Sequence, residues 1–185
     1  YGADATAPGM LVGCILRSPH PHAVIRRIDT AAAEALAGVK AVVTAADFGT
    51  PEDDDVRDVQ DNCMARGKAL YEGHAVAAVA ATTPAVAKEA LKLIEVDYAP
   101  LPHVIDVDEA MKPGAPVVQE GRALETVPAG MSGNVTHYCE FGHGDVEAGF
   151  ARADRIIERT FRTAATHQGY IEPHACLASM GPDGR

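Results

Sequence analysis

The chain has 185 residues, of which 47% are hydrophobic, so it can form one large domain or one domain and part of another. Its formal net charge of −10 and its pI of about 5.2 argue against nucleic acid or an anionic membrane as a partner, since both need clustered lysine and arginine. No apolar run approaches the roughly 20 residues that cross a bilayer.

The first ten residues, YGADATAPGM, lack an initiator methionine and show no secretory signal, and we expect a cut at both ends of the chain. The four cysteines are far apart and form no CxxC pair, and three of them lie in apolar, strand-like segments where cysteine is usually a small buried hydrophobe. We expect reduced thiols in a cytoplasmic protein, and neither disulfides nor zinc or iron–sulfur ligands. These residues are Cys14, Cys63, Cys139 and Cys176.

Residues 10–18 and 23–29 predict two strands, separated by a segment in which proline cannot donate to a ladder. Residues 29–38 predict a short helix with Asp29 or Thr30 as N-cap and Gly38 just past its end. Residues 39–48 predict a buried strand that runs into a turn.

The polar residues 50–61 have no periodicity and predict an exposed loop. Residues 74–82 predict an apolar strand, after which Thr83 caps a helix with Pro84 at its first position. Residues 93–101 predict another strand. The helix has an apolar face that consists of Val86, Ala87, Ala90, Leu91 and Ile94.

The chain changes character after about residue 101. Residues 102–133 are rich in proline, glycine and alanine, with one short helix expected over 106–111, and predict a connecting arm. Further on we expect a helix over 145–152 and the strands of a second sheet over 134–142, 154–164 and 170–180. The order of elements before residue 101 indicates a mixed α/β or α+β sheet. The roughly 50 residues after residue 134 are too few for an independent domain.

Two segments contain residue types that can bind metal. His20 and His22 lie two apart, but a metal site needs three or four ligands, and a rigid turn explains the pair more simply. The acidic run at 51–58 lacks the spacing and glycine of a calcium loop and predicts a solvated loop. The segment around Gly73 and His74 has no dinucleotide-binding fingerprint.

On a strand, alternate residues of the last segment would share one face. A carboxylate and an imidazole there could form an acid–base pair, or a satisfied polar pair at a sheet edge. No serine nucleophile motif accompanies them. The residues of this face are Tyr170, Glu172, His174 and Cys176.

Three long stretches, residues 16–48, 71–111 and 144–179, together resemble the large subunits of the xanthine dehydrogenase and aldehyde oxidase family, the molybdenum hydroxylases. The resemblance covers almost the whole chain in order. Its most specific segments are residues 17–23, 73–80 and 168–173.

The resemblance implies an α/β hammerhead domain over residues 1–101, the arm over 102–133 and the start of a molybdopterin-binding domain over 134–185. It implies that His20 and His22 belong to a structural turn.

The activity implied by the resemblance is oxidation of a small substrate, with water as the oxygen source and a molybdenum–molybdopterin centre as the electron acceptor. Electrons would pass through [2Fe–2S] clusters to FAD, often on separate subunits. Some relatives oxidise carbon monoxide or reduce an aromatic acyl-CoA. The substrate is not readable from the chain, and the chain alone is expected to be inactive.

The family's glycine-rich segment, catalytic glutamate and pterin-binding loops match no segment here, so the resemblance assigns no catalytic residue and no metal ligand. Many members have a glutamine six residues before the equivalent of Glu172, where this chain has Thr166. The resemblance leaves Thr166, His167 and Gln168 as candidates for lining the cofactor site, with Glu172 as a structural carboxylate.

Two other interpretations stay open. One is a stand-alone hammerhead-type binding or assembly module without cofactor. The other is a small metal-dependent hydrolase using His20, His22 and either His74 or His174, which predicts a stoichiometric metal ion.

Overall fold

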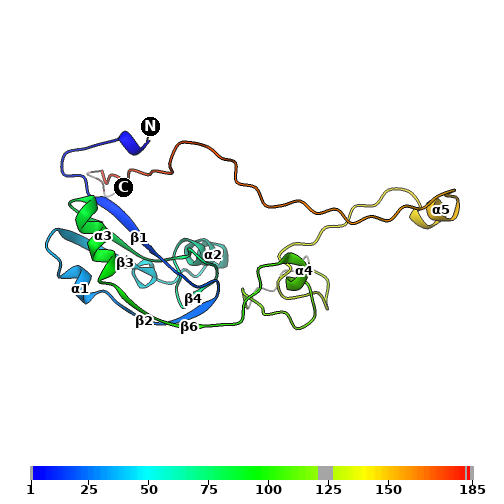
Figure 1. Ribbon diagram of the computed structural model, residues 1–185, viewed down its shortest axis with the longest axis horizontal. Helices are drawn as coiled ribbons and strands as arrows, with labels where there is room; N and C mark the ends of the chain where they lie inside the picture. Colours follow the sequence, from blue (N-terminus) through cyan, green and yellow to red (C-terminus); the bar gives the residue numbers. More distant parts are fainter. Residues whose placement is uncertain (1, 121–126, 182, 184–185) are drawn as a thin grey trace. The chain divides into compact units, whose positions relative to one another are not determined.

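A computed structural model describes residues 2–120, 127–181 and 183 of the chain. The chain divides into two units, whose course along the sequence can be followed in Figure 1. One is Gly9–Tyr138, called the sheet unit below, and the other combines Tyr1–Pro8 with Cys139–Arg185 and is called the extended unit. Each unit is described by itself.

The sheet unit contains two three-stranded antiparallel sheets. The first has the order β1-β5-β3, with β5 (Ala75–Ala81) between β1 (Val12–Arg17) and β3 (Val39–Thr44). In its register, Ala78 pairs with Ile15 on one side and with Val43 on the other.

The second sheet has the order β4-β2-β6, made of β4 (Lys68–Ala69), β2 (Ala23–Asp29) and β6 (Glu95–Pro100). The strands expected at residues 10–18, 23–29, 74–82 and 93–101 are therefore confirmed.

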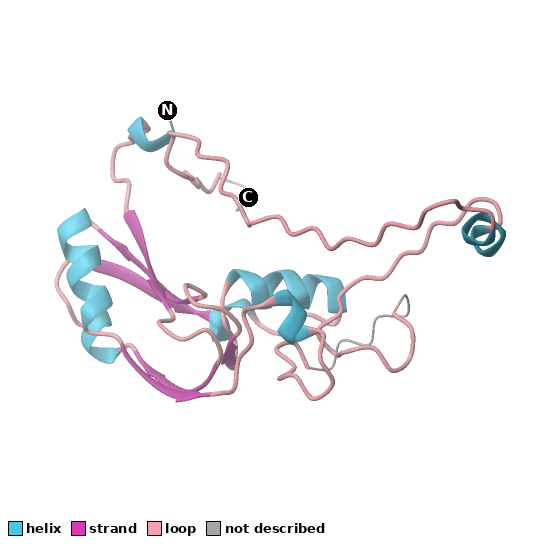
Figure 2. Cartoon of the chain, turned by 45° about the vertical axis from the view of Figure 1, so that its right-hand side comes forward, coloured by secondary structure: helices cyan, strands magenta, loops and turns pink. Residues whose placement is uncertain are grey.

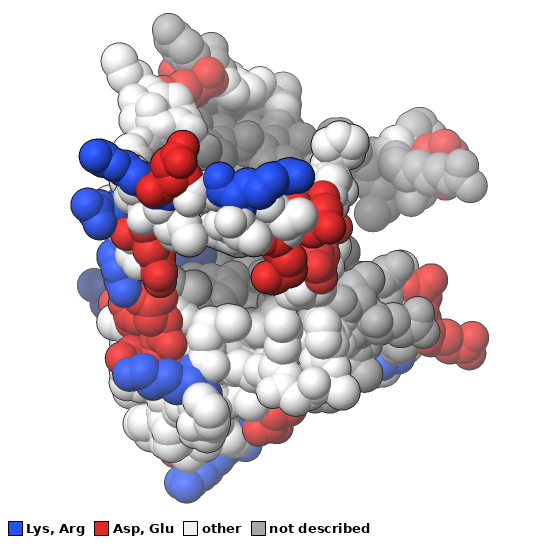
Figure 3. All heavy atoms as spheres, turned by 90° about the vertical axis from the view of Figure 1, so that its right-hand side faces the viewer, with Lys and Arg blue, Asp and Glu red and all other residues white. Residues whose placement is uncertain are grey.

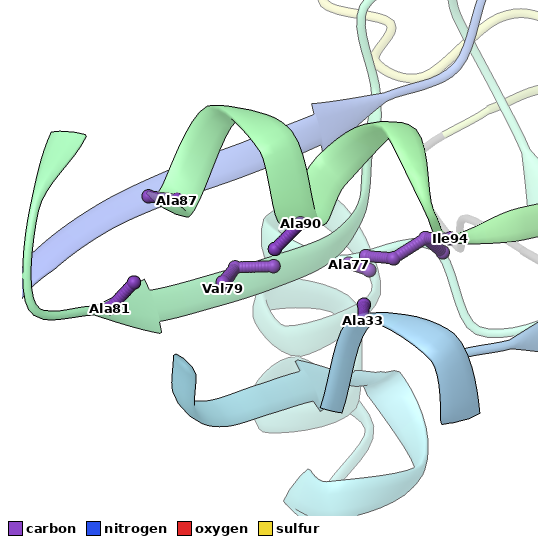
Figure 4. Close-up of a cluster of buried hydrophobic side chains, with 7 residues drawn as sticks. All are labelled: Ala33, Ala77, Val79, Ala81, Ala87, Ala90 and Ile94. Carbon is purple, nitrogen blue, oxygen red and sulfur yellow. The ribbon is translucent and has the colours of Figure 1, made fainter. Parts of the chain in front are cut away.

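Helix α3 (Pro84–Lys92) follows β5 and packs against β1 and β5 of the first sheet (Figure 2). Its start is as expected, because the Thr83 hydroxyl accepts a hydrogen bond from the Val86 amide at 3.2 Å and Pro84 occupies the first turn. The core lies between this helix and β5 (Figure 4). Small side chains let the helix approach the sheet closely. The buried cluster is Ala33, Ala77, Val79, Ala81, Ala87, Ala90 and Ile94.

The first helix is shorter than expected: α1 covers only Ala31–Glu34. Thr30 is its N-cap residue, but the capping bond comes from Asp29, whose carboxylate accepts from the Ala31 amide at 3.1 Å. Gly38 then adopts a φ of +96°, which favours glycine, and its carbonyl accepts from the Thr82 amide at 2.9 Å.

The segment after α1 differs in burial from the prediction. β3 is an edge strand that is only partly buried, because β5 is its one partner in the sheet. The expected turn is a 3-10 helix, η2 (Ala45–Phe48), which starts with a reciprocal cap between Thr44 and Asp47.

The exposed loop expected at residues 50–61 is wrong: helix α2 covers Asp54–Cys63. Asp53 begins it, because its carboxylate accepts from the Val56 amide at 3.1 Å and its carbonyl from the Arg57 amide at 3.0 Å. Capping stabilises a helix whose apolar residues Val56 and Val59 are exposed and therefore contribute little burial.

The arm region packs within the sheet unit. Its expected short helix is α4 (Val107–Ala110), which is capped by the Asp106 carboxylate. The side chain of Asn134 connects several parts of this region. Its Nδ2 donates to the carbonyls of Ala110 (3.2 Å) and Pro116 (2.9 Å), and its Oδ1 accepts from the Val118 amide (3.2 Å). The domain boundaries at 101 and 134 stay a prediction.

The extended unit has little regular structure. It contains η1 (Gly2–Asp4) and the expected helix, α5 (Val146–Ala151), which is capped by the Asp145 carboxylate. The strands expected over 134–142, 154–164 and 170–180 are wrong, because none of the described residues there belongs to a strand. A strand needs a neighbouring strand for its amide and carbonyl groups, and in the described part of the chain no strand pairs with these segments.

None of the helices in the described part of the chain has the length and hydrophobicity to span a bilayer.

Candidate cofactor site

The three predicted site residues lie together on an extended segment after α5, and all three are exposed. The Thr166 hydroxyl donates to the Ala164 carbonyl at 3.4 Å. The Gly169 amide donates to His167 Nδ1 at 3.0 Å, and Gly169 has a φ of +72°, which turns the chain here.

This geometry fixes the tautomer of His167. Because Nδ1 accepts a hydrogen bond, the neutral ring carries its proton on Nε2 and presents a donor. Together with the Thr166 hydroxyl and the Gln168 amide, the segment offers donors and acceptors but no thiolate or carboxylate. These groups fit hydrogen bonding to a polar heterocycle such as the pterin, or to a phosphate, better than metal ligation. Their assignment stays a prediction.

The last segment does not form the predicted one-faced strand. Tyr170 and His174 are hydrogen-bonded through the phenol and Nε2, and their rings meet edge to face at 4.9 Å. Glu172 instead accepts from the Gly2 amide at 3.2 Å. Of the two alternatives left open, an acid–base pair of Glu172 with His174 is not formed, and His174 pairs instead with the phenol of Tyr170, four residues earlier across the bend at 171–172.

His20 and His22 lie in a turn tied to other parts of the sheet unit. The side chain of His22 is buried, and its Nδ1 donates to the Pro102 carbonyl at 2.8 Å. His20 packs edge to face on Tyr98 at 5.0 Å, and the Ser18 hydroxyl bonds both the amide and the carbonyl of His20 at 3.1 Å. These contacts support the structural-turn interpretation.

His74 is a residue whose role the sequence did not indicate. Its ring is completely buried, Nδ1 accepts from the Leu70 amide at 3.2 Å, and Nε2 donates to the Asp61 carbonyl at 2.9 Å. Both nitrogens are thus occupied by backbone, so His74 cannot complete a metal site with His20 and His22. Within the described residues no three His, Cys, Asp or Glu side chains are grouped as ligands.

The expected burial of cysteines in strand-like segments is wrong for Cys139 and Cys176, whereas Cys14 packs against the core cluster. Cys63, Cys139 and Cys176 are exposed and Cys14 is partly buried, and all four are free thiols. Two of the exposed ones lie in segments expected to be strands, and no sheet covers them.

Charged side chains of both signs are interspersed on the face that Figure 3 shows. Among the ion pairs of the sheet unit, Arg27 lies between Asp29 at 2.8 Å and Glu95 at 3.7 Å. A nucleic-acid surface needs basic residues without such acidic neighbours.

The chain matches two known domain families in order. Residues 1–102 match the a/b hammerhead domain of aldehyde oxidase and xanthine dehydrogenase, and residues 128–185 match the molybdopterin cofactor-binding domain. This pair of domains defines the class, the molybdopterin oxidoreductases.

The chain belongs to the aldehyde oxidase and xanthine dehydrogenase family. The predicted family and the predicted fold class, a hammerhead domain followed by the start of a molybdopterin-binding domain, are confirmed.

Two relatives align with all or nearly all of this chain. It is 34% identical to a probable xanthine dehydrogenase component of Bacillus subtilis over 100% of its length, and 38% identical to the carbon monoxide dehydrogenase large chain of Afipia carboxidovorans over 97%. It spans 23% of the length of each of these relatives.

Solved structures of two molybdenum or aldehyde-oxidising enzymes also match the fold of this chain. A copper- and molybdenum-containing carbon monoxide dehydrogenase matches with a TM-score of 0.66 and 36% identity, over 83% of this chain and 20% of the other. The aldehyde oxidoreductase of Desulfovibrio gigas matches with a TM-score of 0.55 and 26% identity, over 65% and 15%.

Proposed function

We propose that this chain acts as part of the molybdenum-containing subunit of an oxidoreductase similar to xanthine dehydrogenase, aldehyde oxidase or carbon monoxide dehydrogenase. The observation that supports this most directly is the succession of hammerhead and molybdopterin-binding sequences along one chain. The whole enzyme would oxidise or hydroxylate a small molecule in the cytoplasm.

When bound, the molybdenum–molybdopterin group would supply the two-electron chemistry, with water as the source of oxygen. FAD and [2Fe–2S] centres on partner subunits or domains would receive the electrons. Because the chain covers a minor part of its relatives, the 185 residues alone are expected to catalyse no turnover.

The role of this chain's residues toward the cofactor would be to hold its polar edge. His167 Nε2 and the Gln168 amide would donate hydrogen bonds, and the Thr166 hydroxyl would donate or accept one. Glu172 would position this segment through its bond to the Gly2 amide and take no part in proton transfer.

The test of the enzyme proposal uses the protein encoded by the complete reading frame. We expect its purified form to contain molybdenum and pterin and to reduce a dye with at least one of a purine, an aldehyde, an N-heterocycle and carbon monoxide. The 185-residue chain should reduce no dye. A complete protein without molybdenum would overturn the proposal and favour a binding or assembly module.

The test of the site uses cofactor content as well as activity. In the complete protein, His167→Leu and Gln168→Leu should lower the amount of molybdenum and pterin per polypeptide. Thr160→Val, another exposed change in the same segment, is the matched control and should leave it unchanged. Full cofactor content in both variants would show that His167 and Gln168 do not hold the cofactor.

A further inference from the structure

His74 lies at the junction between the first sheet and helix α2. Its backbone is fixed to the end of β1, since the Ser18 amide donates to the His74 carbonyl and the Gly73 amide to the Ser18 carbonyl, both at 2.8 Å. Its ring is fully buried and stacks on Tyr71 with centroids 4.4 Å apart and planes 16° apart.

The side chains of His74 and Tyr71 hold the C-terminal end of α2. His74 Nε2 donates to the Asp61 carbonyl at 2.9 Å, and the Tyr71 hydroxyl donates to the Asn62 carbonyl at 3.2 Å. Carbonyls in the last turn of a helix lack partners within the helix. An imidazole and a phenol thus supply the cap that the helix cannot make for itself.

This arrangement requires the neutral ring. Nδ1 accepts from the Leu70 amide at 3.2 Å, so a proton on Nδ1 would place two donors against each other. Burial lowers the pKa of His74, although hydrogen bonds to the backbone at Asp61 and Asn62 and the Asp61 charge oppose this effect. The folded site therefore disfavours the imidazolium.

The charged groups around this site are few. Asp61 of α2 is the carboxylate that acts on the ring, and Arg66 lies on that carboxylate at 3.2 Å. From β1, Arg17 donates to the Gly73 carbonyl at 2.8 Å, and Glu72 beside it is exposed. Because the Arg66 guanidinium partly neutralises the charge of Asp61, this carboxylate stabilises a protonated His74 ring less than an unpaired carboxylate would.

We propose that His74 is an acid-sensitive latch: as the pH falls below neutrality the ring takes up a proton by leaving its site, and α2 opens while both sheets stay folded. The helix is suited to local opening, because Val56 is 48% and Val59 63% exposed, so little apolar burial holds it. The hydrogen bonds of β5, by contrast, lie between two strands in the core.

The direction follows from proton linkage. The open state binds a proton with the ordinary pKa of histidine, about 6.5, and the closed state with a lower one. The contribution of the latch is therefore complete above about pH 6.5 and is lost as the pH falls toward the lowered pKa. Between these values the opening constant of α2 should rise by up to about tenfold for each pH unit.

Hydrogen exchange of the 185-residue chain between about pH 7.5 and pH 5 tests this, after correction for the intrinsic pH dependence of exchange. We expect the opening constant to rise for the amides of α2 and to stay constant for those of β5. An equal rise in both elements would mean global acid unfolding, and no rise in α2 would mean no latch; either result overturns the proposal.

His74→Gln is the non-titrating variant, since an amide can still donate to the Asp61 carbonyl. It should open α2 more readily, but without pH dependence between about pH 7.5 and pH 5. His103→Gln, at an exposed histidine, is the matched control and should keep the pH dependence of the unmodified chain.

If His74→Gln does not fold, the NMR titration of the His74 ring in the unmodified chain decides. Ring protonation and loss of α2 protection should then occur together. Protonation of the ring while α2 stays protected would overturn the latch.

Discussion

The two units of the chain contain similar apolar residues but place them differently. In the sheet unit, Val79 is 1% exposed, whereas in the extended unit Ile157 is 78%, Phe161 88% and Ile171 97% exposed. Residues 154–164 contain isoleucine, phenylalanine and threonine, which favour strands, whereas five of the seven residues of β5 around Val79 are alanine, which does not. The difference shows that a segment forms a strand only where neighbouring strands satisfy the backbone and a helix covers the face.

The largest expected effect separates the two units directly. Val79→Asp places an unpaired carboxylate in the core and should destabilise the sheet unit by at least roughly 3 kcal/mol. Ile157→Asp is the matched control at an exposed position and should leave the free energy of unfolding unchanged. Chemical denaturation followed by circular dichroism measures both, and equal effects would contradict the comparison.

Limited proteolysis should reveal the same difference in the unmodified chain. Trypsin should cut first at the exposed arginines of the extended unit, because cleavage there requires no opening of a sheet. Mass spectrometry of early fragments identifies the sites, and first cuts at Arg17 or Lys92 would refute this expectation. The expected sites are Arg152, Arg155, Arg159 and Arg162.

Gly38→Ala tests the turn before β3. Gly38 has a φ of +96°, and a Cβ there would lie 2.9 Å from the Thr82 hydroxyl and 3.3 Å from Val86, so we expect a loss of about 1–3 kcal/mol. Gly114→Ala, with a φ of +80° and open space, should cost only the backbone strain of about 1 kcal/mol. Thermal unfolding measures the difference, and identical midpoints would exclude a steric contribution.

Tyr98 gives the sheet unit a sensitivity to high pH. Burial raises the pKa of its phenol, and a hydrogen bond with Ser18 partly offsets this. Because the folded state disfavours the phenolate, the contribution is complete below about pH 10 and is lost as the pH rises through the raised pKa. Tyr98→Phe should flatten the decline of stability at alkaline pH, and an unchanged decline would assign it to other groups.

The smallest effect is expected at the ion pair between Lys68 and Glu120, whose charged atoms are 2.7 Å apart. Lys68 lowers the pKa of Glu120 through a hydrogen bond and its charge, but the pair is open to solvent. Glu120→Gln should leave the midpoint of thermal unfolding unchanged. A clear drop would show that this contact holds the arm region.

The sequence by itself determined the parts of the fold that local chemistry governs. Thr83 and Pro84 specified the start of α3, the apolar run at 75–81 specified the central strand, and the family matches confirm the predicted hammerhead. Thr166, His167 and Gln168 were also proposed from sequence, and the structure brings them together only because they are consecutive.

The tertiary structure alone decided where these patterns become ordered structure. Helix α2 was hidden in a polar run because Asp53 caps one end and His74, distant in sequence, holds the other. The expected strands of the extended unit were wrong because alternation specifies a face but supplies no partner. Hydrogen-bond partners and burial depend on residues elsewhere in the chain, and the periodicity within one segment does not reveal which residues these are.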